Sequence, residues 1–170
     1  MKFIKNFLYI LIQCTWGFIQ TLIGFVLFIK YAVKGCKREF YHGAIMTYHD
    51  GDWGGVSLGL FTFVSSKRDD SWLKDAIPHE YGHTIQSLLL GPFYNFIIGI
   101  PSFIWCNGKA GIEKRSNGTS YYDFYTESWA NKCAEKVLKC DKIVYMDIQA
   151  AEIRKKLQEE ITKNKPKVKS

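Results

Sequence analysis

The sequence lacks the cysteine pattern of a disulfide-bonded or zinc-finger protein. Its 170 residues include five cysteines, an odd number with no C-x-x-C pair among them. A small secreted domain stabilised by disulfides usually has an even set of cysteines, and a structural zinc site usually has paired thiolates. The sequence therefore predicts reduced thiols, with the soluble part facing a reducing compartment.

A basic patch on the body of the chain is also missing. The formal net charge is +7, but most of the excess lies in residues 151–170, where Lys and Arg outnumber Glu. A nucleic-acid-binding domain needs its basic residues clustered on a folded surface. We therefore expect no nucleic-acid partner, and we interpret residues 163–170 as a basic tail.

Long apolar runs are what the sequence has instead. From Asn6 to Ile29 no residue is charged, and about 20 apolar residues are enough for a helix to cross a bilayer. We expect a retained membrane helix over residues 3–29, with residues 1–38 forming an anchor and its basic flank; a buried core helix is the alternative. The lysines and arginine at 30–38 favour a cytoplasmic orientation of the remaining chain at the cell membrane.

A second uncharged run extends from His83 to Gly108. Gly91-Pro92 and Ile100-Pro101 interrupt it, and proline disfavours one straight helix through both points. Residues 84–108 are therefore either a segment embedded in the membrane or the core of the protein, and the sequence leaves both possibilities open.

The rest of the chain indicates an α+β fold. Residues 44–48 and 56–64 have the composition of strands, and the glycine-rich turn between them predicts a β-hairpin. Residues 112–122 are polar and rich in turn formers, whereas residues 123–139 and 147–162 predict helices. We therefore expect residues 39–162 to form one metal-binding domain, with a small sheet packed on two ligand-bearing helices.

The pentapeptide H-E-x-x-H at residues 79–83 carries the clearest chemical signal. On a helix, His79 and His83 lie one turn apart on the same face. Two imidazoles at this spacing can bind one Zn²⁺, and Glu80 can act as general base on the metal-bound water. We expect Asp75 to cap this helix and Pro78 to lie in its first turn.

A catalytic zinc ion needs a third protein ligand. No histidine follows His83, and the metzincin pattern is excluded because Gln86 and Leu89 stand where it needs glycine and histidine. The third ligand is therefore His42, His49 or a carboxylate further along the chain.

Glu127 is the carboxylate that we favour. It shares the apolar face of the helix expected at 123–139, where an unpaired carboxylate is costly. Asn131, one turn further on, is placed to orient His79 or His83. Gln86 either hydrogen-bonds to this site or satisfies a nearby carbonyl group.

This combination resembles the gluzincin class of zinc metallopeptidases, in which one helix supplies H-E-x-x-H and a second supplies a glutamate. Together with the run Trp53-Gly54-Gly55-Val56-Ser57-Leu58-Gly59, the motifs are also similar to those of a group of small bacterial membrane proteins. The resemblance implies that His79, His83 and Glu127 bind Zn²⁺. It further implies that Glu80 acts as general base in the attack of a zinc-activated water on a peptide bond. Tyr121, Tyr122 and Tyr125 are candidate oxyanion donors, and the strand at 56–64 is a candidate edge for an extended substrate.

The sequence thus predicts a membrane-associated zinc metallopeptidase whose partners are a peptide or protein substrate and the lipid bilayer. One alternative is a non-catalytic membrane protein stapled by zinc, which acts as a binding or immunity-type partner. A second alternative is a small membrane protein in which H-E-x-x-H is accidental. The oligomeric state is left open.

Overall fold

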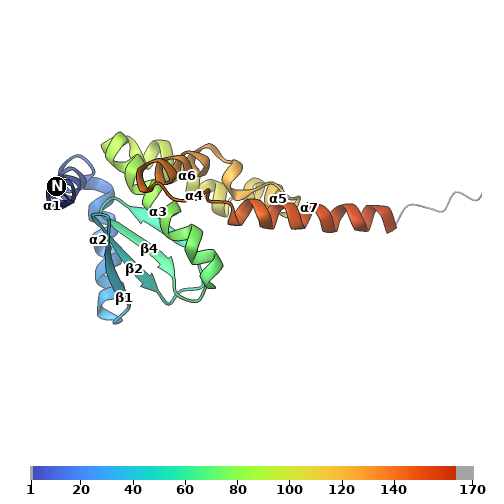
Figure 1. Ribbon diagram of the computed structural model, residues 1–170, viewed down its shortest axis with the longest axis horizontal. Helices are drawn as coiled ribbons and strands as arrows, with labels where there is room; N and C mark the ends of the chain where they lie inside the picture. Colours follow the sequence, from blue (N-terminus) through green and yellow to red (C-terminus); the bar gives the residue numbers. More distant parts are fainter. Residues whose placement is uncertain (1, 164–170) are drawn as a thin grey trace, which may run out of the picture.

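The computed structural model describes residues 2–163, which form seven α-helices and a four-stranded mixed sheet (Figure 1). The helices are α1 (Lys2–Thr15), α2 (Phe18–Val33), α3 (Asp70–Leu90), α4 (Ile100–Asn107), α5 (Lys109–Ser116), α6 (Tyr125–Leu138) and α7 (Tyr145–Lys163). The strands are β1 (Lys37–Tyr41), β2 (Ala44–His49), β3 (Gly55–Leu58) and β4 (Phe61–Ser65). Short helical turns are η1 (Gly91–Phe93), η2 (Asn95–Gly99) and η3 (Tyr121–Asp123). The predicted α+β class is confirmed, and residues 164–170 of the predicted basic tail lie outside the described residues.

The sheet has the strand order β1-β2-β4-β3, in which β2 and β4 are parallel and the other neighbours are antiparallel. The predicted hairpin between residues 44–48 and 56–64 is therefore wrong. Residues 56–64 instead contain two strands, because Gly59 adopts a φ of +64° that favours glycine and turns the chain back on itself. Because β3 pairs with β4 alone among the described strands, it is an edge strand of the sheet.

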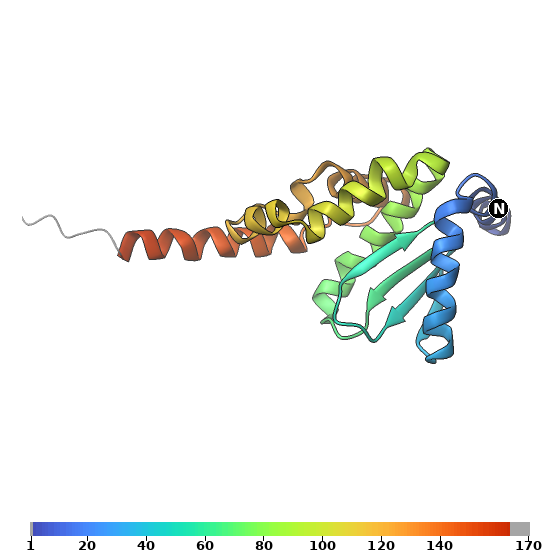
Figure 2. The ribbon, with the colours of Figure 1, turned by 180° about the vertical axis from the view of Figure 1, so that it is seen from behind.

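Helices cover both faces of the inner strand β4, whose five residues are all buried. On one face, the rings of Phe28 and Tyr31 in α2 pack on Phe61 and Phe63. On the other face, Val64 packs with side chains of α3. The sheet is thus held between α2 and α3, as Figure 2 shows.

The first uncharged run bends sharply instead of forming one helix. The chain turns at Trp16-Gly17, and α1 and α2 meet at an angle of 98°. The prediction of a single helix over residues 3–29 is therefore wrong. None of the helices in residues 2–163 is by itself long and apolar enough to cross a membrane, although α1 with α2, and α3 with the helical turns and α4 after it, reach that length and hydropathy as bent pairs.

Polar side chains within the run account for the bend. The Gln13 amide donates to the Thr84 carbonyl oxygen at 3.0 Å, and the Gln20 amide donates to the Ser87 hydroxyl at 2.8 Å. The Ser87 hydroxyl in turn donates to the Gln13 amide oxygen. All four residues are fully buried, and we refer to them as the amide network. A straight helix through residue 29 would break these bonds between the bent pair and α3.

Helix α3 begins earlier than the sequence indicates. The Asp69 carboxylate accepts a hydrogen bond from the Trp72 N–H and caps the helix, so Pro78 lies in its interior. The prediction of an Asp75 cap is therefore wrong. The Asp75 carboxylate accepts hydrogen bonds from the N–H groups of Val144 and Tyr145, at 2.8 Å each, and ties the start of α7 to α3.

The second uncharged run is also divided. Helix α3 ends at Leu90, as Gly91-Pro92 predicts, and the turns η1 and η2 lead into α4. The helices expected at 123–139 and 147–162 are found as α6 and α7, and Asp123, at the start of the first predicted range, belongs instead to the turn η3, which it caps together with Ser120. Part of the polar stretch expected to be turns belongs to α5.

Candidate metal centre

The site lies where α3 and α6 touch, and a glycine inside the H-E-x-x-H motif allows this approach. A Cβ atom at Gly82 would overlap the carbonyl oxygen of Ala130 on α6. Ala130 is itself fully buried. Because the two backbones are in contact here, a side chain from the first turn of α6 can reach the histidines of α3.

Three buried side chains converge at this point. The Nε2 atoms of His79 and His83 lie 3.1 and 3.3 Å from the same oxygen of Glu127, Oε2. One ligand atom from each residue lies within 4.8 Å of the other two. Ligand atoms of a tetrahedral zinc site with bonds of about 2.0–2.1 Å are separated by about 3.3 Å. The spacing of this cluster therefore fits one metal ion.

The second nitrogen of each imidazole is held by an amide. His79 Nδ1 lies 2.6 Å from Asn131 Oδ1, and His83 Nδ1 lies 2.7 Å from Gln86 Oε1. The Gln86 amide nitrogen donates to the Thr126 carbonyl oxygen, which fixes the amide with its oxygen toward His83. His83 therefore carries a proton on Nδ1 and donates it to Gln86. Both roles proposed for Gln86 are found at once.

This arrangement calls for a cation between the ligands. A neutral imidazole with its proton on Nδ1 directs a lone pair from Nε2, and here that lone pair faces a carboxylate oxygen. Two such contacts would be repulsive unless a proton or a metal ion lies between the atoms. The buried His-His-Glu set is thus able to bind a metal ion, with the Nδ1 partners fixing the orientation of both rings.

The two oxygens of Glu127 have separate partners. Oε2 faces the histidines, whereas Oε1 accepts hydrogen bonds from the hydroxyls of Ser102, at 2.5 Å, and Thr126, at 2.8 Å. The side chain is fully buried. These hydroxyls hold the carboxylate in the orientation in which one oxygen is available to a metal.

Charge coupling dominates the electrostatics of the cluster in the absence of metal. Burial alone would raise the pKa of Glu127, but the imidazoles of His83 and His79 outweigh it and hold this pKa well below its usual range. Burial opposes protonation of His83, yet the facing Glu127 carboxylate raises the pKa of His83 to about 9. Without a metal ion, the imidazole of His83 and the carboxylate of Glu127 therefore form an ion pair. A metal ion bound here would take the place of the proton on His83 Nε2.

Glu80 is held by the edge strand β3. The Ser57 hydroxyl donates to the Glu80 carbonyl oxygen at 2.6 Å and lies 2.7 Å from its carboxylate oxygen Oε2. A Cβ atom at Gly55 would overlap the Glu80 carboxylate. Burial raises the pKa of Glu80, against the opposing effect of the two histidines and Ser57, so the carboxyl group is a stronger base than an exposed glutamate.

Neither alternative histidine joins the cluster. His42 lies in the turn between β1 and β2 and contacts the rings of Tyr41 and Tyr81. His49 ends β2, and its ring stacks on Trp53 with the centroids 3.6 Å apart. Their places leave Glu127 as the third residue of the candidate site.

The three candidate oxyanion donors differ in position. The Tyr122 ring centroid lies 5.1 Å from that of His79, and the Tyr121 ring centroid lies 6.4 Å from it. Tyr125 is half exposed, and its hydroxyl donates to the Ile97 carbonyl oxygen at 2.6 Å. Only Tyr121 and Tyr122 are therefore close to the ligands.

Four residues around the site were missed by the sequence analysis. They are Ser57, Ser102, Thr126 and Tyr94, and the Tyr94 hydroxyl donates to the Ser57 carbonyl oxygen at 3.2 Å. Tyr94 and Ser102 are among the polar residues of an uncharged, mostly apolar run, and a buried hydroxyl needs a partner. That polarity was the available signal, but it does not identify the partner.

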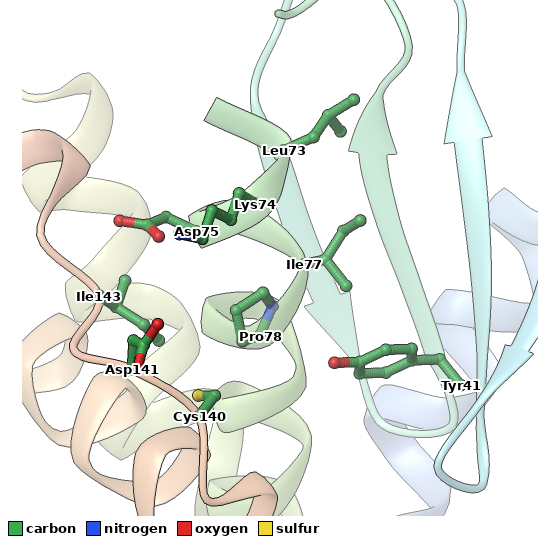
Figure 3. Close-up of a pocket in the computed structure, with 9 residues that line it drawn as sticks. All are labelled: Tyr41, Leu73, Lys74, Asp75, Ile77, Pro78, Cys140, Asp141 and Ile143. Atoms are coloured by element: carbon green, nitrogen blue, oxygen red, sulfur yellow. The ribbon is translucent and has the colours of Figure 1, made fainter. Parts of the chain in front are cut away.

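A separate groove of about 270 Å³ lies on another side of α3 (Figure 3). Tyr41 of β1 lines it together with Cys140, Asp141 and Ile143 and with residues from the first half of α3, including Pro78. Its carboxylate Asp75 is already bonded to the start of α7. The groove contains none of the three metal-binding candidates.

The chain was also compared with known proteins. No family model, curated protein or solved structure matches it.

Proposed function

We propose that this protein is a membrane-associated, zinc-dependent metallopeptidase. The observation that carries the proposal is the pair of Nε2 atoms directed at one oxygen of Glu127, with Glu80 next to the first histidine in the chain. A His-His-Glu set with a neighbouring glutamate is the arrangement of peptidases that activate water on zinc.

The residues divide the chemistry among them. His79, His83 and Glu127 would hold Zn²⁺. Bound there, zinc would supply a Lewis acid that polarises a peptide carbonyl and lowers the pKa of water to about 7. Glu80 accepts a proton from the attacking water and delivers it to the leaving amine, a role suited to a carboxyl group whose pKa is raised by burial.

The substrate would lie along β3. This strand is at the edge of the sheet, and its Ser57 contacts Glu80 directly. An extended peptide that pairs with an edge strand places its scissile bond beside the residues that the strand contacts. The edge therefore provides both the binding surface and the positioning of the general base.

Membrane association is supported by the inverted polarity of α1 and α2. Gln13, Gln20 and Thr21 point inward and are buried, whereas most of the large apolar side chains of these helices are exposed. A helix at the surface of a protein in water has the opposite arrangement. Helices in lipid direct polar residues toward one another and apolar residues outward.

Zinc content and peptide hydrolysis of the detergent-purified protein test the proposal. We expect about one zinc per chain and hydrolysis of a generic peptide pool. Glu80→Gln should abolish hydrolysis and leave zinc bound, whereas Glu113→Gln, at an exposed glutamate of α5, should change neither. Undiminished hydrolysis by the Glu80→Gln protein would contradict the mechanism.

A second function, a metal-stapled binding partner without catalysis, is favoured by the burial of the site. His79, Glu80 and His83 are each 6 % exposed, and Glu127 is 0 % exposed. A metal ion enclosed in this way can stabilise the fold through its binding free energy, and this structural role requires no access for a substrate. This function predicts that chelation unfolds the protein and that zinc-loaded protein hydrolyses no peptide, in detergent or in vesicles.

A further inference from the structure

One stretch of chain, residues 91–107, covers the metal centre, and we refer to it as the cover segment. The Ser102 hydroxyl of this segment donates to Glu127, and the Tyr94 hydroxyl donates to the Ser57 carbonyl oxygen on β3. A third bond joins the Tyr125 hydroxyl to the Ile97 carbonyl oxygen. The cover segment is thus fastened to a metal ligand, to the edge strand and to the start of α6.

The outer face of the cover segment is apolar. Phe96 is 70 % exposed and Phe103 is 68 % exposed, and no residue from Thr84 to Gly108 carries a charge. The exposed large side chains of the segment are Phe93, Phe96, Ile97, Ile100, Phe103 and Ile104. A contiguous apolar surface of this kind marks a binding surface, not a solvated one.

This face continues into the exposed face of α1 and α2. A Cβ atom at Gly91 would overlap the ring of Trp16, so the turn that starts the cover segment lies against the bend between the two helices. The Gln20 amide also donates to the Gly91 carbonyl oxygen at 3.0 Å. The two bent helix pairs therefore present adjoining apolar surfaces.

Basic residues stand at the margins of these surfaces. Lys30 lies near the end of α2, and Lys109 and Lys114 lie on α5 just beyond the cover segment. Lys34 and Arg115 stand beside them but already have partners, Asp50 and the carbonyl oxygens of Trp105 and Cys106. Basic side chains beside an apolar face match anionic headgroups above acyl chains. This charge pattern, and the continuity with the inverted helices α1 and α2, identify the occupant of the face as a lipid bilayer.

We propose that the cover segment lies in the acyl region of a bilayer and that the metal centre takes membrane-inserted peptides from that side. The substrate class rests on the proposed peptidase function. The Tyr94 hydroxyl donates a hydrogen bond to the Ser57 carbonyl oxygen. An extended peptide paired with β3 would use the same oxygen as the acceptor for one of its N–H groups. A shift of the cover segment frees this acceptor, and the π-helical turn Asn95–Gly99 within it is a place where helices commonly adjust.

Fluorescence quenching in reconstituted vesicles tests the lipid contact without any activity measurement. In a protein with its five natural cysteines replaced by serine, a fluorophore is attached at Phe96→Cys, at Phe103→Cys or at Ile148→Cys. Ile148, on α7, is the matched control because it is also an exposed apolar residue, at 55 %. The vesicles contain phosphatidylcholine and phosphatidylglycerol.

We expect nitroxide-labelled acyl chains to quench the probes at 96 and 103, and aqueous iodide to quench only the probe at 148. Equal quenching by iodide at all three positions would overturn the lipid contact. If the probes at 96 and 103 are protected from both quenchers, a protein surface, such as a second copy of the chain, covers the face. That result would also overturn the lipid contact.

The substrate class is tested with one peptide sequence in two forms, free in solution and joined to a membrane-spanning anchor. We expect the anchored form to be hydrolysed faster by the zinc-loaded protein in vesicles, and Tyr94→Phe to raise hydrolysis of the free form at unchanged zinc content. Equal rates for both forms would overturn the inference about the substrate. Rates no higher than those of Glu80→Gln in every arm would contradict the peptidase function and the substrate class that rests on it, whereas the lipid contact is decided separately by the quenching result.

Discussion

Helix α3 carries two buried polar networks, one toward α6 and one toward α1 and α2. The first joins His79, His83 and Glu127, whose side chains can carry charge. The second is the amide network, in which Gln13 and Gln20 bond to Thr84 and Ser87 without any charge. Both lie away from water, yet only the first changes its energy when protons or cations bind.

The difference shows that one helix can carry two buried polar networks of unlike chemistry. A neutral amide or hydroxyl pair does not titrate between about pH 4 and pH 9, and it offers Zn²⁺ neither an imidazole nor a carboxylate ligand. A buried carboxylate facing two imidazoles is held together by charge, so its stability depends on what cation it binds. The comparison predicts that changes on the α6 side are large and condition-dependent, whereas those on the α1/α2 side are small and constant.

The largest effect is expected from removal of the carboxylate. Glu127→Ala should lower zinc affinity by more than the roughly 10–100-fold that follows loss of a residue that only orients a ligand. Zinc per chain after dialysis against a weak chelator measures this, with Glu113→Ala on α5 as the control. Retention of one zinc by the Glu127→Ala protein would remove this residue from the site.

The next effect is a pH dependence confined to the charged network. Because the pKa of His83 rises from 6.5 to about 9 on folding, its pairing with Glu127 stabilises the metal-free protein below pH 6.5 and is lost as pH rises toward 9. A pKa difference of this size corresponds to about 3 kcal/mol. The lowered pKa of Glu127 adds a loss below about pH 4.5, so metal-free stability should be highest between about pH 4.5 and 6.5.

Urea unfolding of the metal-free protein at pH 5.5 and pH 9 measures this change. The raised pKa of Glu80 acts in the same direction, so the comparison uses Glu80→Gln protein with and without Glu127→Gln. The second substitution should flatten the profile, and an equally steep profile without Glu127 would refute the coupling. Zinc affinity should follow the opposite trend and rise with pH, because protons must leave the histidines before the metal binds.

A smaller effect is expected where the two helices touch. Gly82→Ala should destabilise the protein by about 1–3 kcal/mol, because the new Cβ overlaps the Ala130 carbonyl and pushes α6 away from α3. Gly99→Ala is the control, since a Cβ there meets nothing closer than 3.4 Å. Urea midpoints of both variants give the answer, and equal midpoints would mean that the α3–α6 contact is looser than described.

The smallest effect concerns the amide network. Gln13→Leu removes the bonds to Thr84 and Ser87 and should lower the free energy of unfolding by about 1 kcal/mol, as is typical for neutral hydrogen bonds. The loss should be the same at pH 5.5 and pH 9, in contrast to the charged network. A loss that varies with pH would break the distinction between the two faces of α3.

Much of the candidate site could be predicted from local sequence patterns. The helical spacing of His79 and His83 fixes their common face, and the burial of Glu127 follows from its place on the apolar side of its helix. The partners Asn131 and Gln86 also lie at helical spacings from these ligands. Such relations depend only on the helix repeat, which is the same in every fold.

The parts that could not be predicted depend on contacts between distant segments. Ser57 meets Glu80 and Tyr94 meets Ser57 only because β3 folds back at Gly59 and the cover segment crosses its edge. The bend at Trp16-Gly17 likewise arises from glutamines whose partners lie on α3. In sequence these glutamines only dilute an apolar run.

The sequence by itself determined that one helix would present His79 and His83 on one face, that a second helix would carry Glu127 on its apolar side, and that uncharged segments would lie near the first, because residue type and helical period are local properties. The tertiary structure alone decided that Glu127 directs one oxygen at both histidines, that β3 holds Glu80, and that polar side chains of the apolar run point inward. Those outcomes depend on close approaches to three glycines, by the α6 backbone at Gly82, by the Glu80 carboxylate at Gly55 and by the Trp16 ring at Gly91. Which glycine meets which neighbour is set by the packing of the whole chain.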